Sequence, residues 1–109
     1  MPDADAARRP LSAVLLHFDG CPNWHVVDDR LREALAWAGR EDVRVEYREV
    51  STPEEAAAVQ FRGSPTVLVN GQDPFADPDS PVGLSCRVYR TEDGLSGAPT
   101  VQQLWEALR

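Results

Sequence analysis

The stretch that decides the fold is LSAVLLHFDGCPNW, residues 11–24, in which an apolar run ends in a turn and is followed by a cysteine. Residues 11–18 are almost continuously apolar and are bounded by Asp19-Gly20, which is typical of a strand covered on both faces. Pro22 suits the first position of a helix, where its missing N–H is not needed. We therefore expect Cys21 to lie between the end of a strand and the start of a helix.

The helix after Cys21 is predicted over residues 23–38. Apolar side chains recur there at the three- and four-residue spacing of one helix face, and most charged side chains fall off that face. Gly39 follows directly and suits the left-handed conformation that ends many helices.

The rest of the chain predicts, in order, a strand, a helix, two strands and a helix. Alternating or apolar runs mark the strands, and capping boxes at residues 52–55 and 100–103 mark the helix starts. These elements are expected over residues 43–50, 53–61, 66–70, 85–90 and 101–109. The order βαβαββα predicts an α/β fold, with a four-stranded mixed sheet flanked by three helices. The first two strands should be parallel, through a right-handed crossover, and the last two antiparallel.

Length and composition predict one soluble domain. The chain has 109 residues, of which 42% are hydrophobic. Residues 11–109 are expected to form the domain, whereas residues 1–10 are polar and aperiodic and are expected to form a flexible tail. A formal net charge of −7 argues against nucleic-acid binding, which needs a basic face. No apolar run approaches the about 20 residues that cross a membrane.

The start of the chain is acidic, unlike a secretory signal, so we expect a cytoplasmic protein, and a monomer. A cysteine in that reducing compartment is more often reactive or structural than bridged. The 2 cysteines exclude a disulfide scaffold and a four-thiolate metal site within one chain. No cofactor is indicated.

Two motifs in this element order resemble the thioredoxin-like superfamily in its short, glutaredoxin-sized form. They are CPNW at residues 21–24, after the first strand, and GSPT at residues 63–66, before the third. More narrowly, residues 15–24 resemble small bacterial "thioredoxin family" proteins. The resemblance covers residues 11–109 and implies a redox-active Cys21 beside a cis-proline at Pro65. It also implies that a peptide or small thiol pairs with the backbone before Pro65 like an added strand. The contact residues expected for that partner are Pro22, Trp24, Ser64, Pro65 and Thr66. An ordinary trans turn at Pro65 is the alternative.

Cys21 is the candidate nucleophile. The free N–H groups and the dipole at a helix start favour a thiolate, the form that attacks disulfides. The alternative is a buried, inert cysteine, and shielding of Cys21 from solvent would argue against a redox role.

The position that holds a second cysteine in two-cysteine relatives is Trp24 here, which leaves a single-thiol cycle through an external thiol. Cys86 is expected at the far end of the returning strand, too distant to bridge to Cys21, as an ordinary sheet residue. A register shift caused by the loop at residues 72–83 would change that expectation.

Three further side chains lie near Cys21 in the predicted fold. His17, near the end of the first strand, is a candidate acid or base, with a backbone-bonded strand histidine as the alternative. Trp24 could cover Cys21 and offer an apolar platform, or pack in the core. We expect His25 to be exposed to solvent.

The loop acids Asp73, Asp77 and Asp79 lack the glycine and the bidentate glutamate of a calcium loop, so we expect a solvated loop and no metal site.

These residues support three hypotheses about function. The first is a single-cysteine thiol–disulfide oxidoreductase acting on a mixed disulfide with a protein or small thiol. The second is a non-catalytic thioredoxin-like module that binds a partner or a soft metal, Hg(II) or Cu(I), at the same face. The third is a redox sensor in which Cys21 is oxidised to sulfenic acid and capped by a small thiol.

Overall fold

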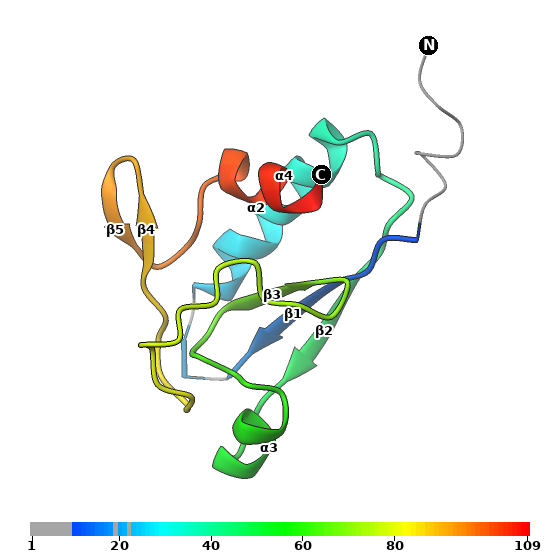
Figure 1. Ribbon diagram of the computed structural model, residues 1–109. Coiled ribbons are helices and arrows are strands. Elements are labelled where there is room, and N and C mark those ends of the chain that lie inside the picture. Colours follow the sequence, from blue (N-terminus) through cyan, green and yellow to red (C-terminus); the bar gives the residue numbers. More distant parts are fainter. Residues whose placement is uncertain (1–9, 19, 22) are drawn as a thin grey trace.

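The computed structural model describes residues 10–18, 20–21 and 23–109. It forms a mixed α/β structure in which helices cover both faces of a small sheet (Figure 1). In chain order the elements are β1 (Ala13–His17), α2 (Trp24–Trp37), β2 (Val45–Glu49), α3 (Pro53–Ala58), β3 (Thr66–Val69), β4 (Tyr89–Thr91), β5 (Gly94–Ser96) and α4 (Val101–Leu108).

The main sheet has three strands in the order β2-β1-β3. β1 and β2 are parallel and joined through α2, as predicted, with Leu15 opposite Tyr47. β3 runs antiparallel to β1, with Leu15 opposite Val67. The carboxyl end of β1 therefore lies beside the amino end of β3, which brings the Cys21 region and the Pro65 region to one end of the sheet.

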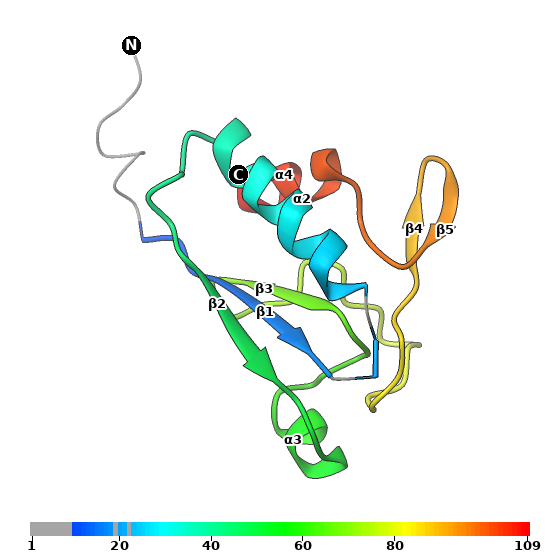
Figure 2. The same cartoon turned by 180° about the vertical axis from the view of Figure 1, so that it is seen from behind.

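The apolar run of β1 is buried on both faces, as its composition predicts. Ala13 and Leu15 belong to the larger core, which α2 and α4 cover. Val14 and Leu16 belong to a second core on the opposite face, with Ala56 of α3 and Phe61. Figure 2 shows α2 and α4 together on one side of the sheet and α3 away from them. The central strand is thus fixed from both sides.

The expected four-stranded sheet is not found in the described residues. The strand expected over residues 85–90 is replaced by the short β4, which pairs with β5 in a separate two-stranded hairpin rather than with β3. Bends occupy residues 83–85, and Cys86 takes part only in an isolated bridge with Ser64. The chain therefore reaches the end of the sheet near Pro65 before the hairpin begins.

The predicted starts of α3 and α4 agree with the capping chemistry. Thr100 accepts a hydrogen bond from Gln103 N at 3.1 Å, and Thr100 N donates to Gln103 Oε1 at 2.9 Å, which completes the capping box of α4. Thr52 accepts from Glu55 N at 3.1 Å and opens α3. α3 ends at Ala58, earlier than expected, and Gln60 has a positive φ of 54°.

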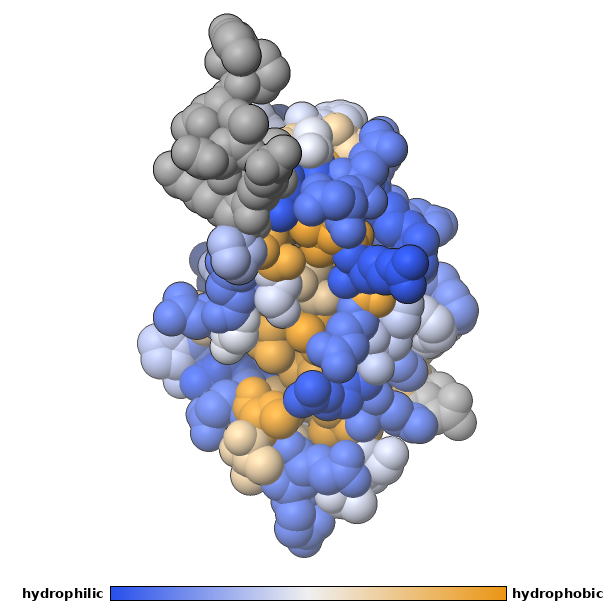
Figure 3. Space-filling view, turned by 90° about the vertical axis from the view of Figure 1, so that its right-hand side faces the viewer, coloured by the Kyte–Doolittle hydropathy of each residue, from blue (hydrophilic) through white to orange (hydrophobic). Residues whose placement is uncertain are grey.

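β2 lies at the edge of the main sheet. Its residues from Glu46 to Glu49 are exposed, and Arg48 forms a 3.9 Å ion pair with Glu46. Figure 3 shows one face of the molecule, on which apolar groups form an interrupted column between hydrophilic side chains. Among the described residues, no helix combines the length and apolar character needed to cross a bilayer.

Candidate functional site: Cys21, cis-Pro65 and Cys86

Cys21 lies between β1 and α2, as predicted, and next to the proline of the second motif. Its thiol donates a hydrogen bond to Ser64 O at 3.4 Å, and the Ser64–Pro65 peptide bond is cis. The two motifs that the sequence singled out, 43 residues apart, thus meet through a direct contact.

The surroundings of the Cys21 sulfur differ from the expectation in two ways. Cys21 is only 1% exposed, so its sulfur is shielded from solvent. Among the described residues, its hydrogen bond goes to a carbonyl oxygen rather than coming from an amide at the start of α2. Pro22, a predicted contact residue, lies outside the described residues.

The backbone of Ser64 is already paired within the chain. Ser64 N donates to Ser85 O at 2.7 Å, and Arg87 N donates to Ser64 O at 2.8 Å. Ser64 is fully buried, and its hydroxyl accepts a 3.3 Å hydrogen bond from Phe18 N. Residues 85–87 therefore occupy the backbone groups that the resemblance assigned to an incoming peptide.

Cys86 lies at this site and not at the far end of the sheet. It is the bridge partner of Ser64 in the parallel sense, and it is exposed. The expectation failed because the loop after β3 returns the chain to the amino end of that strand before β4 begins. The two thiols of the chain therefore both lie next to Ser64, one buried and one exposed, and both are free.

The two thiols interact directly. The pKa of Cys86 is raised above its ordinary value, chiefly by a hydrogen bond with the Cys21 side chain, then by desolvation and by the charge of Cys21. The Cys21 and Cys86 side chains are therefore neighbours, since both lie against Ser64.

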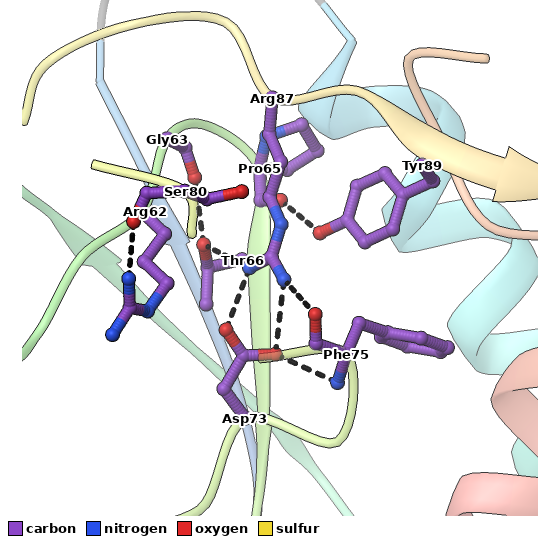
Figure 4. Close-up of polar contacts among 9 residues, drawn as sticks. All are labelled: Arg62, Gly63, Pro65, Thr66, Asp73, Phe75, Ser80, Arg87 and Tyr89. Carbon is purple, nitrogen blue, oxygen red and sulfur yellow. Dashed lines mark hydrogen bonds and ion pairs between the residues drawn. The ribbon is translucent and has the colours of Figure 1, made fainter. Parts of the chain in front are cut away.

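Arg87 holds residues 85–87 against the sheet (Figure 4). Its guanidinium donates to Asp73 at 2.7 Å and 3.3 Å, to Thr66 Oγ1 at 3.1 Å and to Phe75 O at 2.7 Å. The side chains of Arg87 and Asp73 are 7% and 11% exposed. Such a buried and fully hydrogen-bonded pair is costly to break from one side. The expectation that Asp73 is a solvated loop acid was wrong, although Asp77 and Asp79 are exposed.

Tyr89 and Thr66 link this ion pair to the cis-proline. The Tyr89 hydroxyl donates to Pro65 O, and the Arg87 guanidinium lies 4.8 Å from the Tyr89 ring centroid. Burial raises the pKa of the Tyr89 hydroxyl far above its usual range. Thr66 is buried and donates to Gly63 O at 2.6 Å, so this predicted contact residue is part of the interior here.

His17 and Trp24 form an aromatic group beside the site. Their rings stack at 4.6 Å with an interplanar angle of 18°, and the His25 ring lies 3.7 Å from that of Trp24. His17 Nδ1 is buried and has no hydrogen-bond partner in the part of the chain that the structure describes. His25 is exposed, as expected. Trp24 also packs against the larger core, which is the second of the two roles expected for it.

The described residues contain no group of three or more His, Cys, Asp or Glu side chains arranged to hold a metal ion. The remaining candidate metal ligands are the two adjacent thiols of Cys21 and Cys86. A pair of thiolates suits a soft metal ion of low coordination number.

Cys86 was expected at the far end of the sheet, and the Arg87–Asp73 pair was not predicted. Both depend on the path of the loop between residues 70 and 88, which residue spacing does not determine. One indication was present: a half-buried strand pattern around residues 85–90 that includes an arginine requires a buried partner for that charge.

The fold and site together define a mixed α/β protein with a cis-proline and two adjacent thiols at one end of its sheet. Comparison with protein families, curated proteins and solved structures found no match to this chain. The resemblance to thioredoxin-like proteins therefore remains an expectation from the two sequence motifs.

Proposed function

We propose that the protein is thioredoxin-like and carries out thiol–disulfide exchange at Cys21, with a protein disulfide or a small thiol as partner, in the cytoplasm. The observation that carries the proposal is the 3.4 Å contact of Cys21 Sγ with the carbonyl oxygen that precedes cis-Pro65. A thiol at a strand–helix junction, next to such a proline, matches the arrangement that both motifs implied.

The burial of Cys21 restricts this proposal. A sulfur that is 1% exposed cannot be the first atom that an incoming disulfide meets in this conformation. A cycle that uses Cys21 alone would therefore be slow, since buried cysteines are poorly reactive. A single-cysteine cycle was expected because Trp24 replaces the second cysteine and Cys86 was thought to be too distant. Since Cys86 lies beside Cys21, that reason no longer holds.

The experiment is to expose the native, reduced protein to a disulfide reagent and to locate the modified sulfur by mass spectrometry. Entry of Cys21 into a disulfide in the wild type, and its absence in Cys21→Ser, support the proposal. A Cys21 that stays a free thiol in the native protein, yet reacts after unfolding, would leave a small folded adaptor as the remaining function.

The contact between the thiols also favours the second function, capture of a soft metal ion. Cys21 and Cys86 could supply two thiolates to Hg(II) or Cu(I), which accept two-coordinate sulfur sites. The reduced protein would be titrated with each ion, beside Cys21→Ser. Loss of tight binding in a variant that still folds supports metal capture, and no binding by the wild type excludes it.

A further inference from the structure

Cys86 occupies the position in which the resemblance placed an incoming peptide. The backbone groups on either side of it, Ser85 O and Arg87 N, both bond to Ser64. An added strand beside the residue before the cis-proline would pair in this way. The chain thus presents its own cysteine to Cys21, on a segment anchored by a buried ion pair.

Exposure separates the roles of the two sulfur atoms. Cys86 is exposed, whereas Cys21 is enclosed by its contacts with Ser64 and Cys86. Apolar side chains flank Cys86 at the surface, with Leu84 37% and Val88 60% exposed. A partner therefore meets Cys86 before it meets Cys21, and the apolar flanks favour a disulfide with apolar neighbours.

We propose that Cys86 is a catalytic thiol that attacks the incoming disulfide first, and that Cys21 resolves the product by forming a Cys21–Cys86 disulfide. This inference rests on the proposed exchange function and assigns the order of its steps. It replaces the single-thiol cycle with a two-thiol cycle whose second sulfur comes from a distant part of the sequence.

The exchange takes place in two steps. The Cys86 thiol loses its proton to solvent, and its thiolate attacks one sulfur of the partner disulfide, whose S–S bond breaks; the released thiolate takes up a proton. Cys21 then loses its proton, and its thiolate attacks Cys86 Sγ, releasing the second partner thiol. The two protein thiols are oxidised and the partner disulfide is reduced. Two equivalents of a low-molecular-weight thiol, or one of a dithiol, return the protein to its starting state.

The raised pKa of Cys86 bears on the rate of the first step. While the Cys21 side chain holds a hydrogen bond with Cys86, a smaller fraction of Cys86 is thiolate, so the first attack should become faster as the pH rises through the alkaline range. Once Cys86 carries a partner sulfur, that hydrogen bond is lost and the two sulfur atoms are already in contact for the second step.

The test uses a dipyridyl disulfide, which releases a coloured thiopyridone from each half that leaves. With one equivalent of reagent, the wild type should release both halves, and its intact mass should show the loss of the two thiol hydrogens. Cys21→Ser should release one half and keep the other as a stable adduct on Cys86. Cys86→Ser should react at least about tenfold more slowly, because the remaining thiol is buried.

A matched control keeps two thiols in the chain but separates them. Ser12 is exposed and lies just before β1, at the end of the strand opposite Cys21. The 5 residues of β1, at about 3.3 Å each, separate Ser12 from that end of the sheet. This separation is far beyond the roughly 7 Å between Cα atoms that a disulfide allows. The double variant Ser12→Cys/Cys86→Ser should retain an adduct on the introduced thiol and form no internal disulfide.

The outcomes separate the inference from the function on which it rests. A persistent adduct in the wild type, with the other thiol free, overturns the two-thiol cycle. An adduct that forms on Cys21 in Cys86→Ser at the wild-type rate overturns the order of steps and leaves exchange at Cys21 standing. Native wild-type protein in which Cys21 never enters a disulfide overturns the proposed function itself.

Discussion

Gly63 lies directly against Arg87: a Cβ added at Gly63 would come within 3.1 Å of Arg87 Cβ and 3.0 Å of Ser85 O. Gly63 also has a φ of +114°, which residues with a side chain rarely adopt. The residue therefore allows the segment that carries Cys86 to approach Ser64 closely.

Gly63→Ala should push residues 85–87 away from Ser64 and slow formation of the Cys21–Cys86 disulfide several-fold. Gly71→Ala is the matched control, since Gly71 also has a positive φ, of +81°, but has open space around its added Cβ. Both variants bear about 1–2 kcal/mol of backbone strain. The rate of internal disulfide formation should fall only in Gly63→Ala; equal rates would contradict the role of this contact.

Arg87→Met should destabilise the protein by about 3–5 kcal/mol, because it leaves the Asp73 carboxylate buried without its partner. The free energy of unfolding in urea measures this effect. Arg48→Met is the control, since Arg48 pairs with Glu46 on the exposed edge of β2, and such a change should stay within about 0.5 kcal/mol. The double variant Asp73→Leu/Arg87→Met should recover part of the loss; no recovery would argue against the buried charge as its cause.

Alkylation of Cys86 by iodoacetamide should depend on pH with a midpoint above that of an ordinary thiol, because its pKa is raised. In Cys21→Ala the midpoint should fall, since the hydrogen bond that contributes most to the shift is removed. Labelling rates across the alkaline range, read by mass spectrometry at Cys86, check this. A midpoint that Cys21→Ala leaves in place would show that the two thiols do not interact.

The same shift has a consequence for stability. The folded state holds the Cys86 proton more tightly than the unfolded state, so this contribution to stability is complete below the unfolded pKa, about 8.5. It is lost as the pH rises through the folded pKa. The unfolding midpoint of the wild type should therefore decline more steeply above about pH 8.5 than that of Cys86→Ser.

Phe61→Ala should cost about 3–5 kcal/mol, because Phe61 is fully buried in the core between the sheet and α3. The loss is measured as the free energy of unfolding in urea, and the slope of that free energy against urea concentration should stay unchanged. Val88→Ala, at a side chain that is mostly exposed, should remain within about 0.5 kcal/mol. A loss of less than about 1 kcal/mol in Phe61→Ala would show that this face collapses around the missing ring.

The elements that the sequence located well are those whose signals are local. Residues 11–18 are apolar on both faces and became the central strand, and the Thr100–Gln103 capping box begins α4 at the expected residue. The parallel pairing of β1 and β2 follows from the intervening helix, whose length leaves few alternatives.

The site was only partly predictable, because its second half depends on long-range contacts. The cis bond at Pro65 and its proximity to Cys21 followed from two motifs. The position of Cys86 followed from no motif: it is set by Arg87, whose charge draws the segment onto Asp73. The expectation that residues 85–90 return as a strand antiparallel to the third strand placed Cys86 at the wrong end of the sheet.

The edge position of β2 has a consequence for how copies of this protein behave together. An unpaired strand edge offers free N–H and C=O groups to any other extended chain, which is a route to fibrous aggregation. On β2 the neighbouring side chains Glu46 and Arg48 carry opposite charges at the surface, and both lose hydration if another strand docks there. The acidic and basic pair thus keeps the molecule from extending its sheet into a neighbour.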